Sequence, residues 1–350
     1  MKENLHKKLF FLIGIILLMT FVGTANAKSK MTIKIELLQK HVKISMAGAG
    51  KARIDWGDGK SNNLVLLPSN TEYCHDYDVH VDLSDPIFGY LPSYTITISG
   101  KNVTGLYLQG NLNYPGSSYD IYDTEIQCLE LDVSHNRVLM DLYCPGQYFE
   151  NLDVSKNIAL VKLDCWGNQL TTLDVSKNTA LKELSCGLNQ LTELDVNNNI
   201  ALEELFCDDN EITNLDISKN KNLEWLTCEN SRITSLDISK NAALIILDCS
   251  NNELTNLDVS NNPLLRQLYC THNFLTTLDV RNNTELNHLE CESNYLSETA
   301  LNILFGTLHD KKNVWMDMFK DKYIYVDDNV GSKSCDKSIA ENKGWKVSVK

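Results

Sequence analysis

Cysteine and aspartate residues recur at one fixed spacing in the middle of this 350-residue chain, and both residue types can do chemistry. Oxidised cysteines form disulfides, and a row of aspartates can bind calcium. Eight cysteines stand 21 residues apart, at Cys144, Cys165, Cys186, Cys207, Cys228, Cys249, Cys270 and Cys291. Eight aspartates keep the same step, at Asp132, Asp153, Asp174, Asp195, Asp216, Asp237, Asp258 and Asp279. The chemistry open to either set depends on how successive 21-residue units lie relative to one another.

The constant period of 21 residues predicts a solenoid, in which each unit forms one coil and stacks on the next. Cysteines one coil apart would lie side by side, about 4.8 Å apart, with parallel Cβ directions. A disulfide needs Cβ atoms about 3.8 Å apart that face each other. We therefore expect a column of reduced, buried thiols. Cys128, in a leucine position of the preceding half-coil, is expected in the core too, which leaves Cys74 and Cys335 outside the column.

The repeated sequence resembles the leucine-rich repeat family. The two halves of one unit have similar spacing, with Leu160, Leu163, Cys165 and Asn168 in one and Leu170, Leu173, Val175 and Asn178 in the other. This nested arrangement resembles the IRREKO subclass of short bacterial repeats and internalin-like proteins. The resemblance implies a right-handed β-solenoid over residues 102–295. Because both halves look strand-like, we expect weak curvature and no helix before the C-terminal end.

The aspartate column places like charges about 5 Å apart, and each neighbour costs about 1 kcal/mol in water. Hydrogen bonds from nearby hydroxyls or backbone amides can offset this repulsion, as can lysines three residues later in four units, at Lys156, Lys177, Lys219 and Lys240. Calcium bridging is the alternative, although the repeat lacks the glycine-rich turn of calcium-binding solenoids. A third column, from Asn136 to Asn283, is interpreted as structural, since buried asparagines can bond the backbone of their own bend and of the next coil.

The first 27 residues have the composition of a signal peptide. Lys2, Lys7 and Lys8 precede an apolar run, which small residues around Ala27 follow. A membrane anchor is the alternative, but the run is short for a bilayer-spanning helix. We expect export to the periplasm, the cell surface or the medium. Cleavage would leave 29 basic and 45 acidic residues, a net charge of −16, which disfavours nucleic acid and anionic membranes as partners.

Residues 28–101 predict a β-sandwich, because segments 32–37, 42–44 and 94–98 alternate between apolar and polar residues. The string Trp56-Gly57-Asp58-Gly59, with His75-Asp76-Tyr77, resembles polycystic-kidney-disease (PKD) type domains, which implies an immunoglobulin-like sandwich. Segment 78–92 departs from that pattern, and residues 112–125 are interpreted as an insertion.

Two motifs of this region could be mistaken for ligand sites. Asp55 and Asp58 could be metal ligands, but roles in a strand and its turn fit better. Gly48-Ala49-Gly50-Lys51 resembles a phosphate loop, but Ala52 stands where serine or threonine is required and no helix follows. We assign no site to either motif.

Residues 296–350 leave the 21-residue period and predict a small α/β cap. Ser297 can cap a helix that runs to Leu308, and strands are expected at 323–326 and from Trp345, with a short helix at 335–342 between them. We interpret four large residues of this region as packing rather than as a ligand pocket: Trp315, Met316, Met318 and Phe319.

The outward-pointing residues of the first half-coil are varied, whereas those of the second half are monotonous. Rings and carboxylates in this set are typical of interfaces, which predicts a partner-binding surface at Tyr143, Asp164, Trp166, Phe206, Asp208, Trp225, Glu229, Asp248, Tyr269 and His288. A protein or peptide is the expected partner. Two alternatives are that the rings only cover the sheet and that the surface binds carbohydrate.

The sequence contains no H-E-x-x-H, G-x-S-x-G or Walker motif, and His272 and His288 occupy different positions in their coils. We therefore predict a monomeric, non-enzymatic binding protein without a cofactor. Its predicted fold class is mainly β, with an N-terminal β-sandwich, a right-handed leucine-rich repeat β-solenoid and a small α/β C-terminal cap.

Overall fold

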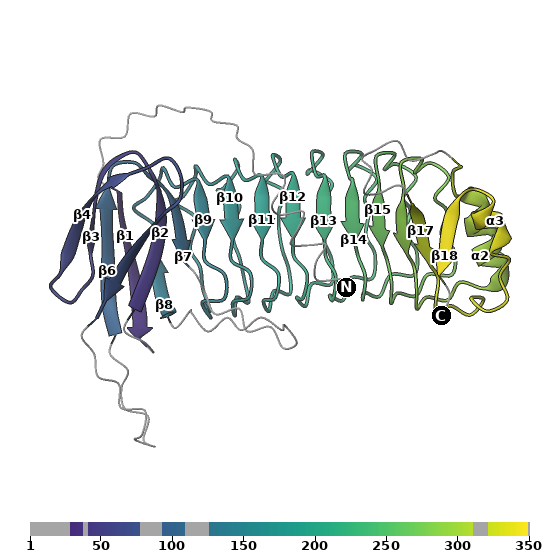
Figure 1. The fold of residues 1–350 in the computed structure, drawn as a ribbon, viewed down its shortest axis with the longest axis horizontal. Helices are drawn as coiled ribbons and strands as arrows, with labels where there is room; N and C mark the ends of the chain where they lie inside the picture. The colour runs from purple at the N-terminus through teal and green to yellow at the C-terminus, as the bar shows by residue number, and fades with distance from the viewer. Residues whose placement is uncertain (1–28, 38–40, 78–92, 109–125, 311–320, 349–350) are drawn as a thin grey trace, which may run out of the picture.

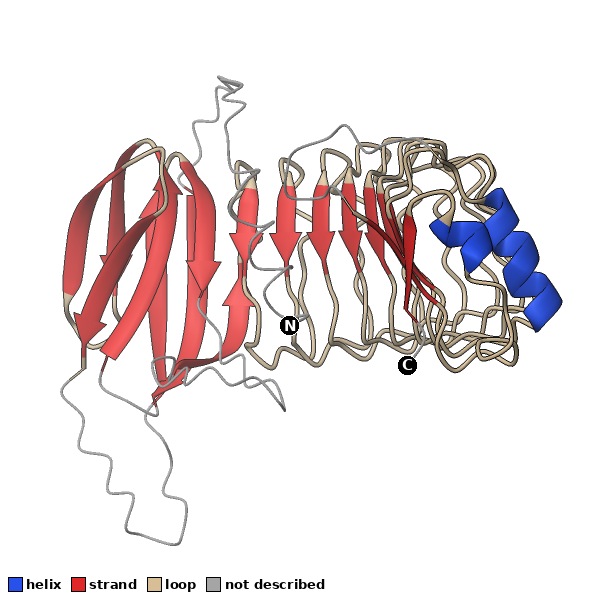
Figure 2. Cartoon of the chain, turned by 45° about the vertical axis from the view of Figure 1, so that its right-hand side comes forward, coloured by secondary structure: helices blue, strands red, loops and turns tan. Residues whose placement is uncertain are grey.

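A computed structural model describes residues 29–37, 41–77, 93–108, 126–310 and 321–348 of the chain. Three parts follow one another along the long axis of the molecule, a strand-rich N-terminal part, a row of stacked coils and a helical end (Figures 1 and 2). The predicted mainly β fold class is confirmed. Four predictions fall outside the described residues: the signal peptide at 1–27, segment 78–92, the insertion at 112–125 and the packing of Trp315, Met316, Met318 and Phe319.

The N-terminal part is built from strands of two sheets. Strand order in the first sheet is β4-β3-β6-β1-β8, all antiparallel where pairs are described. β5, β2 and β7 begin the second sheet. The strands are β1 (Ser29–Leu37), β2 (His41–Gly48), β3 (Gly50–Asp55), β4 (Ser61–Leu66), β5 (Thr71–Asp76), β6 (Ser93–Gly100), β7 (Val103–Leu108) and β8 (Ile126–Asp132). Alternate residues of β1 and β2, such as Ile33 and Ile44, are buried between the sheets.

The tryptophan motif of this part is structural. Asp55 ends β3 and accepts the amide of Gly57, and Asp58 accepts the amide of Lys60 in the turn, so the expected roles in a strand and its turn are confirmed. His75 Nε2 lies 2.9 Å from Asp58 Oδ2, and the His75 ring stacks on Trp56. These contacts fasten the turn to β5.

The sandwich and the solenoid share their sheets. β7 pairs antiparallel with β2 on one side and parallel with β9 on the other. β8, which comes from the second half of the same coil, pairs antiparallel with β1. The first coil therefore ends in strands of the sandwich, so its apolar end is covered by hydrogen-bonded neighbours.

One short parallel strand forms in each 21-residue unit. These strands are β9 (Asp141–Tyr143), β10 (Lys162–Asp164), β11 (Glu183–Ser185), β12 (Glu204–Phe206), β13 (Trp225–Thr227), β14 (Ile246–Asp248), β15 (Gln267–Tyr269) and β16 (His288–Glu290). Each pairs in register with the residues 21 positions away, for example Leu163 with Leu184. β5, β2, β7 and β9 to β18 form one 13-stranded sheet in the described structure, with little curvature along the row of coils (Figure 1).

After the first coil, whose second half contains β8, the second half of each coil forms no strand in the described residues, which corrects the prediction that both halves are strand-like. Its backbone instead bends in turns, as where the amide of Asn178 bonds Val175 O at 3.0 Å. Leu173 and Val175 still point into the core, as expected. An extended, bent segment can bury apolar residues at this spacing, because burial requires only that their side chains point inward. It does not require β-ladder hydrogen bonds.

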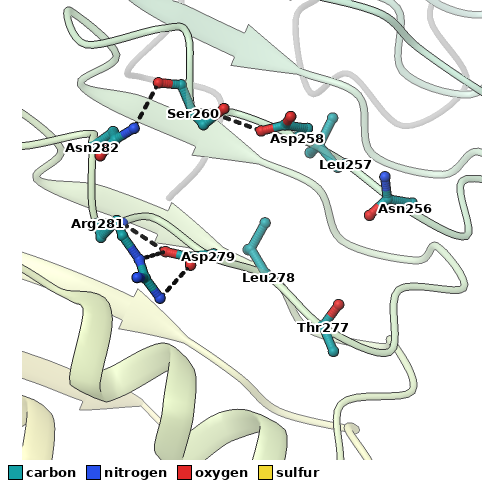
Figure 3. Close-up of a pocket in the computed structure, with 9 residues that line it drawn as sticks. All are labelled: Asn256, Leu257, Asp258, Ser260, Thr277, Leu278, Asp279, Arg281 and Asn282. Atoms are coloured by element: carbon teal, nitrogen blue, oxygen red, sulfur yellow. Dashed lines mark hydrogen bonds and ion pairs between the residues drawn. The ribbon is translucent and has the colours of Figure 1, made fainter.

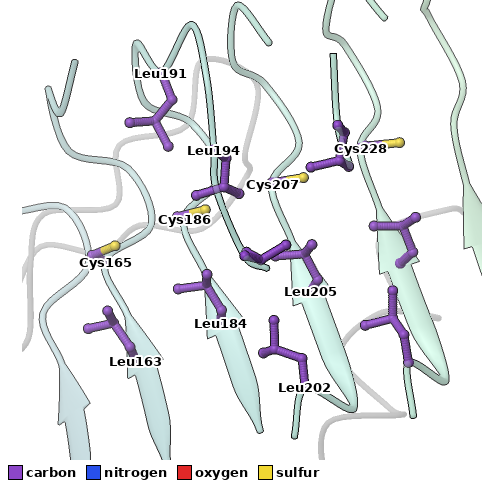
Figure 4. Close-up of a cluster of buried hydrophobic side chains, with 14 of the residues drawn as sticks. Leu163, Cys165, Leu184, Cys186, Leu191, Leu194, Leu202, Leu205, Cys207 and Cys228 are labelled. Carbon is purple, nitrogen blue, oxygen red and sulfur yellow. The ribbon is translucent and has the colours of Figure 1, made fainter. Parts of the chain in front are cut away.

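The core of the solenoid is a stack of leucines and thiols. Cys165, Cys186, Cys207 and Cys228 lie side by side on successive coils beside rows of leucine (Figure 4), and all eight cysteines of the column are buried and unbridged. The thiol of Cys207 donates to Thr227 O at 3.4 Å, so it also links one coil to the next. The expectation of reduced, buried thiols, with Cys128 in the core, is confirmed.

Two asparagine columns satisfy the backbone where the coil bends. Asn189 Nδ2 donates to Cys165 O and Cys186 O, and its Oδ1 accepts the amide of Leu170. In the second half, Asn178 Nδ2 donates to Val154 O and Asn157 O of the preceding coil. The structural interpretation holds, although the bonded carbonyls of this second column lie in the preceding coil and not in its own bend.

Within the predicted cap, the described residues 296–310 and 321–348 have the expected α/β structure. α2 (Glu298–Thr307) is capped by Ser297, whose Oγ accepts the amide of Ala300. β17 (Lys322–Tyr325) and β18 (Trp345–Ser348) extend the parallel sheet, with α3 (Ser338–Glu341) between them. Lys343 Nζ donates to the carbonyls of Gly306 and Leu308 at the end of α2. Figure 2 shows the helices at the end of the solenoid, where they cover the last coils.

Thiol reactivity tests the cysteine column. Native protein treated with iodoacetamide should be alkylated first at Cys74, which is exposed, and more slowly at the half-buried Cys335. The buried thiols should react only after unfolding, because alkylation requires access and a thiolate. Mass spectrometry of native and denatured samples gives the count, and a disulfide between column cysteines would contradict the stacked arrangement.

The asparagine column of the first half-coil, which has Gln147 at its first position, is interrupted at Ser231. This residue stands between Asn210 and Asn252, and its buried Oγ has no hydrogen-bond partner in the described structure. Ser231→Asn should restore bonds to Cys207 O and Cys228 O and stabilise the fold by about 1–2 kcal/mol. Urea denaturation measures the change, with the exposed Ser235→Asn as the control, and an unaltered midpoint would show that the gap cannot hold an asparagine.

Candidate functional site

The outer face of the parallel sheet is the candidate site. Parallel sheets are normally covered on both faces, but here no described segment covers the outer one. We define the strand face as the first and third residues of β9 to β16, Tyr323 and Tyr325 of β17, and the residue that follows each column cysteine. Neighbouring residues of this face lie one strand spacing apart, about 4.8 Å, so a partner would meet several coils at once.

Nine of the ten predicted site residues are half-buried on this face, and Tyr143 is 37% exposed. The expected exposure of the outward-pointing rings is only partly found, since four of them are half-buried: Trp166, Phe206, Trp225 and Tyr269. Side chains of adjacent coils cover the flanks of each ring, because the strand spacing is smaller than the width of a ring. The outward direction itself was predicted correctly, since the middle residue of each strand is buried.

The rings of the strand face form three groups. Phe206 and Trp225 meet edge to face with centroids 5.1 Å apart. Tyr143 lies beside Tyr107 at the sandwich end, with centroids 6.4 Å apart. At the other end, His288 lies between Tyr269 and Tyr325, at 5.0 and 5.4 Å. The central group is the one that combines two large rings with several carboxylates.

Trp166 reaches across a neighbouring coil. A Cβ on Gly187 would lie 2.9 Å from both Trp166 Nε1 and Asp208 Oδ1, so the absence of a side chain at Gly187 lets the indole approach the carboxylate. The indole and Thr227 Oγ1 both bond the Asp208 side chain, the latter at 3.0 Å. Two predicted residues, 42 positions apart in the sequence, are therefore in contact.

Burial perturbs the carboxyl groups of the face. It raises the pKa of Asp164 and of Asp248 to about 6. Burial and the neighbouring charge of Asp248 raise the pKa of Glu229 to about 7, and burial raises the pKa of Asp208. Each group has a hydrogen-bond donor, such as Asn251 Nδ2 at 3.1 Å from Glu229 Oε1. At neutral pH the centre of the face therefore holds charge that the fold itself destabilises.

Cations of the chain are found at the two ends of the strand face. Lys162 lies 2.5 Å from Glu183, and His288 Nε2 lies 2.9 Å from Glu290. Between them, in the described structure, Asp208, Glu229 and Asp248 form no ion pair within 4.0 Å of a lysine, arginine or histidine nitrogen. The centre of the face is thus both aromatic and uncompensated in charge.

The fold brings five predicted residues together on three adjacent strands or just after them: Phe206, Asp208, Trp225, Glu229 and Asp248. The other five lie towards the two ends of the same face, at Tyr143, Asp164, Trp166, Tyr269 and His288.

Sequence reasoning missed several rings that join these groups, Tyr107, Tyr323 and Tyr325, because the strands that carry them lie outside the regular 21-residue columns. It also missed the exposed stacked pair Phe274 and Tyr295, although these two residues are one period apart. That periodicity was the signal that could have found the pair.

A hollow of about 290 Å³ lies on the second half of two neighbouring coils, away from the strand face (Figure 3). Arg281 bonds Asp279, and Asn282 Nδ2 donates to Ser260 O, so the polar groups around it already have partners within the chain. A similar hollow separates the preceding pair of coils. We interpret both as the spacing between repeated coils, since the same residues recur there.

The aspartate column is satisfied by hydrogen bonds from its own turns. Asp153, Asp174 and Asp258 each accept the backbone amide two residues later at 2.9 Å. Hydrogen bonds from the serine at that position lower the pKa of these carboxyls. Among the described residues, no group of three or more histidine, cysteine or acidic side chains has the geometry of a metal site.

Comparison with solved structures identifies the repeat architecture. The functional domain of InlJ from Listeria monocytogenes, which includes a cysteine ladder, is 30% identical with a TM-score of 0.52, over 63% of this chain and 52% of that one. A leucine-rich repeat protein of Leptospira interrogans is 21% identical with a TM-score of 0.53, over 62% and 56%. This chain therefore spans just over half the length of both structures. No protein-family model and no curated protein matches it.

The stacked coils, the in-register parallel strands and these two likenesses show that the chain has the fold of a leucine-rich repeat β-solenoid. No helix in the described part of the chain has the length and apolar character needed to cross a membrane.

Stability should depend on pH in two opposite ways. The face carboxyls have raised pKa values in the folded state, so between about pH 4 and pH 7 the folded chain binds more protons and stability falls as pH rises. The turn aspartates have lowered pKa values, so their contribution is present above about pH 4 and is lost in more acidic solution. We expect maximum stability near pH 5.

The double variant Glu229→Gln, Asp248→Asn should lose much of the decline towards neutral pH. Between about pH 5 and pH 7.5, the free energy of unfolding should fall by about 1–3 kcal/mol less in the variant than in the wild type. Urea denaturation across this pH range measures it, and Glu150→Gln, Glu193→Gln is the control with the same change in charge. A wild-type curve that rises from pH 5 to 7.5 would contradict the analysis.

Proposed function

We propose that this chain is a non-enzymatic binding protein that recognises a protein or peptide through the strand face. The observation that carries the proposal is the central group, in which Phe206 and Trp225 lie 5.1 Å apart beside Asp208, Glu229 and Asp248. Aromatic residues in half-buried positions are typical anchors of protein interfaces, because they bury a large area with few rotatable bonds. A rigid row of strands holds them in place without the partner.

The ring geometry favours a protein partner over a sugar. A sugar ring stacks on an exposed aromatic face, but Phe206 and Trp225 are inclined by 72° and each covers part of the other. Phe274 and Tyr295 are the specific observation in favour of carbohydrate binding. Their planes are inclined by only 22°, and the two residues are 44% and 55% exposed. A glycan array in which Phe274→Ala, Tyr295→Ala abolishes a selective signal would support that second function.

The proposal includes no catalytic step. The three histidine–carboxylate pairs on the described residues are His75 with Asp58, His288 with Glu290 and the exposed pair His135 with Asp132. Neither of the first two rings is bonded to a serine, threonine or cysteine side chain there, as a nucleophile would require. Ser134 Oγ lies 3.0 Å from His135 Nδ1, but Asp132 faces that same nitrogen, so the ring is not placed between hydroxyl and carboxylate as in a catalytic triad. The first pair lies against Trp56 in the sandwich, and the second lies between two tyrosines.

Two further parts of the proposal concern the ends of the solenoid and the location of the protein. Residues 28–101 would serve as a PKD-type module that also covers the first coil, whose strands β7 and β8 pair with it. Residues 1–27 would direct export, so that the strand face meets its partner in the periplasm, at the cell surface or in the medium. The acidic charge supports a partner other than nucleic acid.

A peptide-display experiment tests the binding surface. A random library of about twelve-residue peptides, long enough to cross the central coils when extended, is selected on the wild type and on Phe206→Ala, Trp225→Ala. Peptides enriched on the wild type should bind the variant at least about tenfold more weakly, because two anchors are removed.

The matched control is Ile158→Ala, Ile200→Ala, which removes two exposed apolar side chains from another part of the coils. Equal affinity of the selected peptides for the wild type and the anchor variant would refute the proposal. Urea denaturation of each variant shows whether the fold is retained.

A further inference from the structure

The middle of the strand face differs from its ends in a way that defines the chemistry of the partner. Building on the proposed function, we propose that β12 (Glu204–Phe206), β13 (Trp225–Thr227) and β14 (Ile246–Asp248) dock a protein segment that carries lysine or arginine side chains. The sheet face is unpartnered over these strands within the described structure. Charge complementarity identifies the occupant.

The first argument is the placement of charge along the face. Lys162 compensates Glu183 near the sandwich, and His288 bonds Glu290 near the cap. Three carboxylates of consecutive coils lie between these pairs, and none has a cation within 4.0 Å in the described residues: Asp208, Glu229 and Asp248. The polar donors that hold them are the neutral groups Thr227 Oγ1, Asn251 Nδ2 and the amide of Ser250.

The second argument is the apolar surface beside these carboxylates. Phe206 is the third residue of its strand, and Asp208 follows it by two positions on the same coil. One coil later, Glu229 occupies the position equivalent to Asp208, and Trp225, the first residue of its strand, lies against the Phe206 ring. A lysine or arginine has an aliphatic stem and a charged head, so the stem can lie on the Phe206–Trp225 pair while the head reaches the acids. A small cation would use the carboxylates but not the rings.

The third argument is energetic. Burial disfavours the charged form of these groups, which is why the pKa of Glu229 rises to about 7 and that of Asp248 to about 6. A cationic side chain placed among them would favour the charged form again. Binding of the partner therefore relieves a repulsion that the free protein carries.

The test uses the peptides selected on the wild type in the display experiment. Lysine and arginine should be enriched among them relative to the unselected library. A synthetic selected peptide should bind Asp208→Asn, Glu229→Gln, Asp248→Asn at least about tenfold more weakly than the wild type, since each charge pair contributes a few-fold. The control is Glu150→Gln, Glu193→Gln, Glu341→Gln, which removes the same net charge at exposed positions off the strand face and should change affinity less than about twofold.

The outcomes separate this proposal from the general one. Selected peptides that depend on Phe206 and Trp225 but show no lysine or arginine enrichment would overturn the cationic partner and leave the binding surface in place. Equal weakening by both carboxyl triples would also overturn it, because attraction to the net charge alone would then explain the affinity. Peptides that bind the anchor variant as well as the wild type would refute both proposals.

Discussion

The contact of each coil with the next is the interaction on which the rest of this structure depends. A three-residue strand offers few hydrogen bonds, and a single coil cannot enclose its own leucines. Stacking removes both difficulties, because the parallel ladder, the asparagine side chains and the thiol of a residue such as Cys207 all bond a neighbouring coil. If one coil unfolds, the apolar core of its neighbours is therefore exposed to water as well as its own.

The ends of such a stack must be closed, and the chain closes them in different ways. At the start, β7 and β8 of the first coil join two sheets of the sandwich, so cap and solenoid are continuous through backbone hydrogen bonds. At the other end, β17 and β18 continue the ladder while Lys343 bonds the carbonyl end of α2. Both solutions cover apolar coil surface that water would otherwise meet.

The two long sides of the coil carry carboxylates under opposite conditions. On the turn side, aspartates such as Asp174 are exposed and accept an amide of their own turn, so their ionised form contributes to stability. On the strand side, Asp248 and Glu229 are crowded and half-buried, so ionisation opposes folding. Natural proteins hold such unfavourable groups at places that bind partners, which is consistent with a strand face that binds and a turn side that supports.

The sequence by itself determined which residues of each coil point inward and stack. A strict period places leucine, cysteine and asparagine at equivalent positions, and equivalent positions stack in any solenoid, so the buried thiols and the inward leucines could be predicted. The outward direction of Phe206 and Trp225 followed from the same register.

Only the tertiary structure decided what lies beside each outward residue. The second half-coil bends instead of pairing, Gly187 lets Trp166 reach Asp208, and Tyr325 completes the group around His288 from outside the repeat. These contacts join residues of different coils, whose closeness depends on packing and not on spacing within a repeat, so no pattern in the sequence contains them.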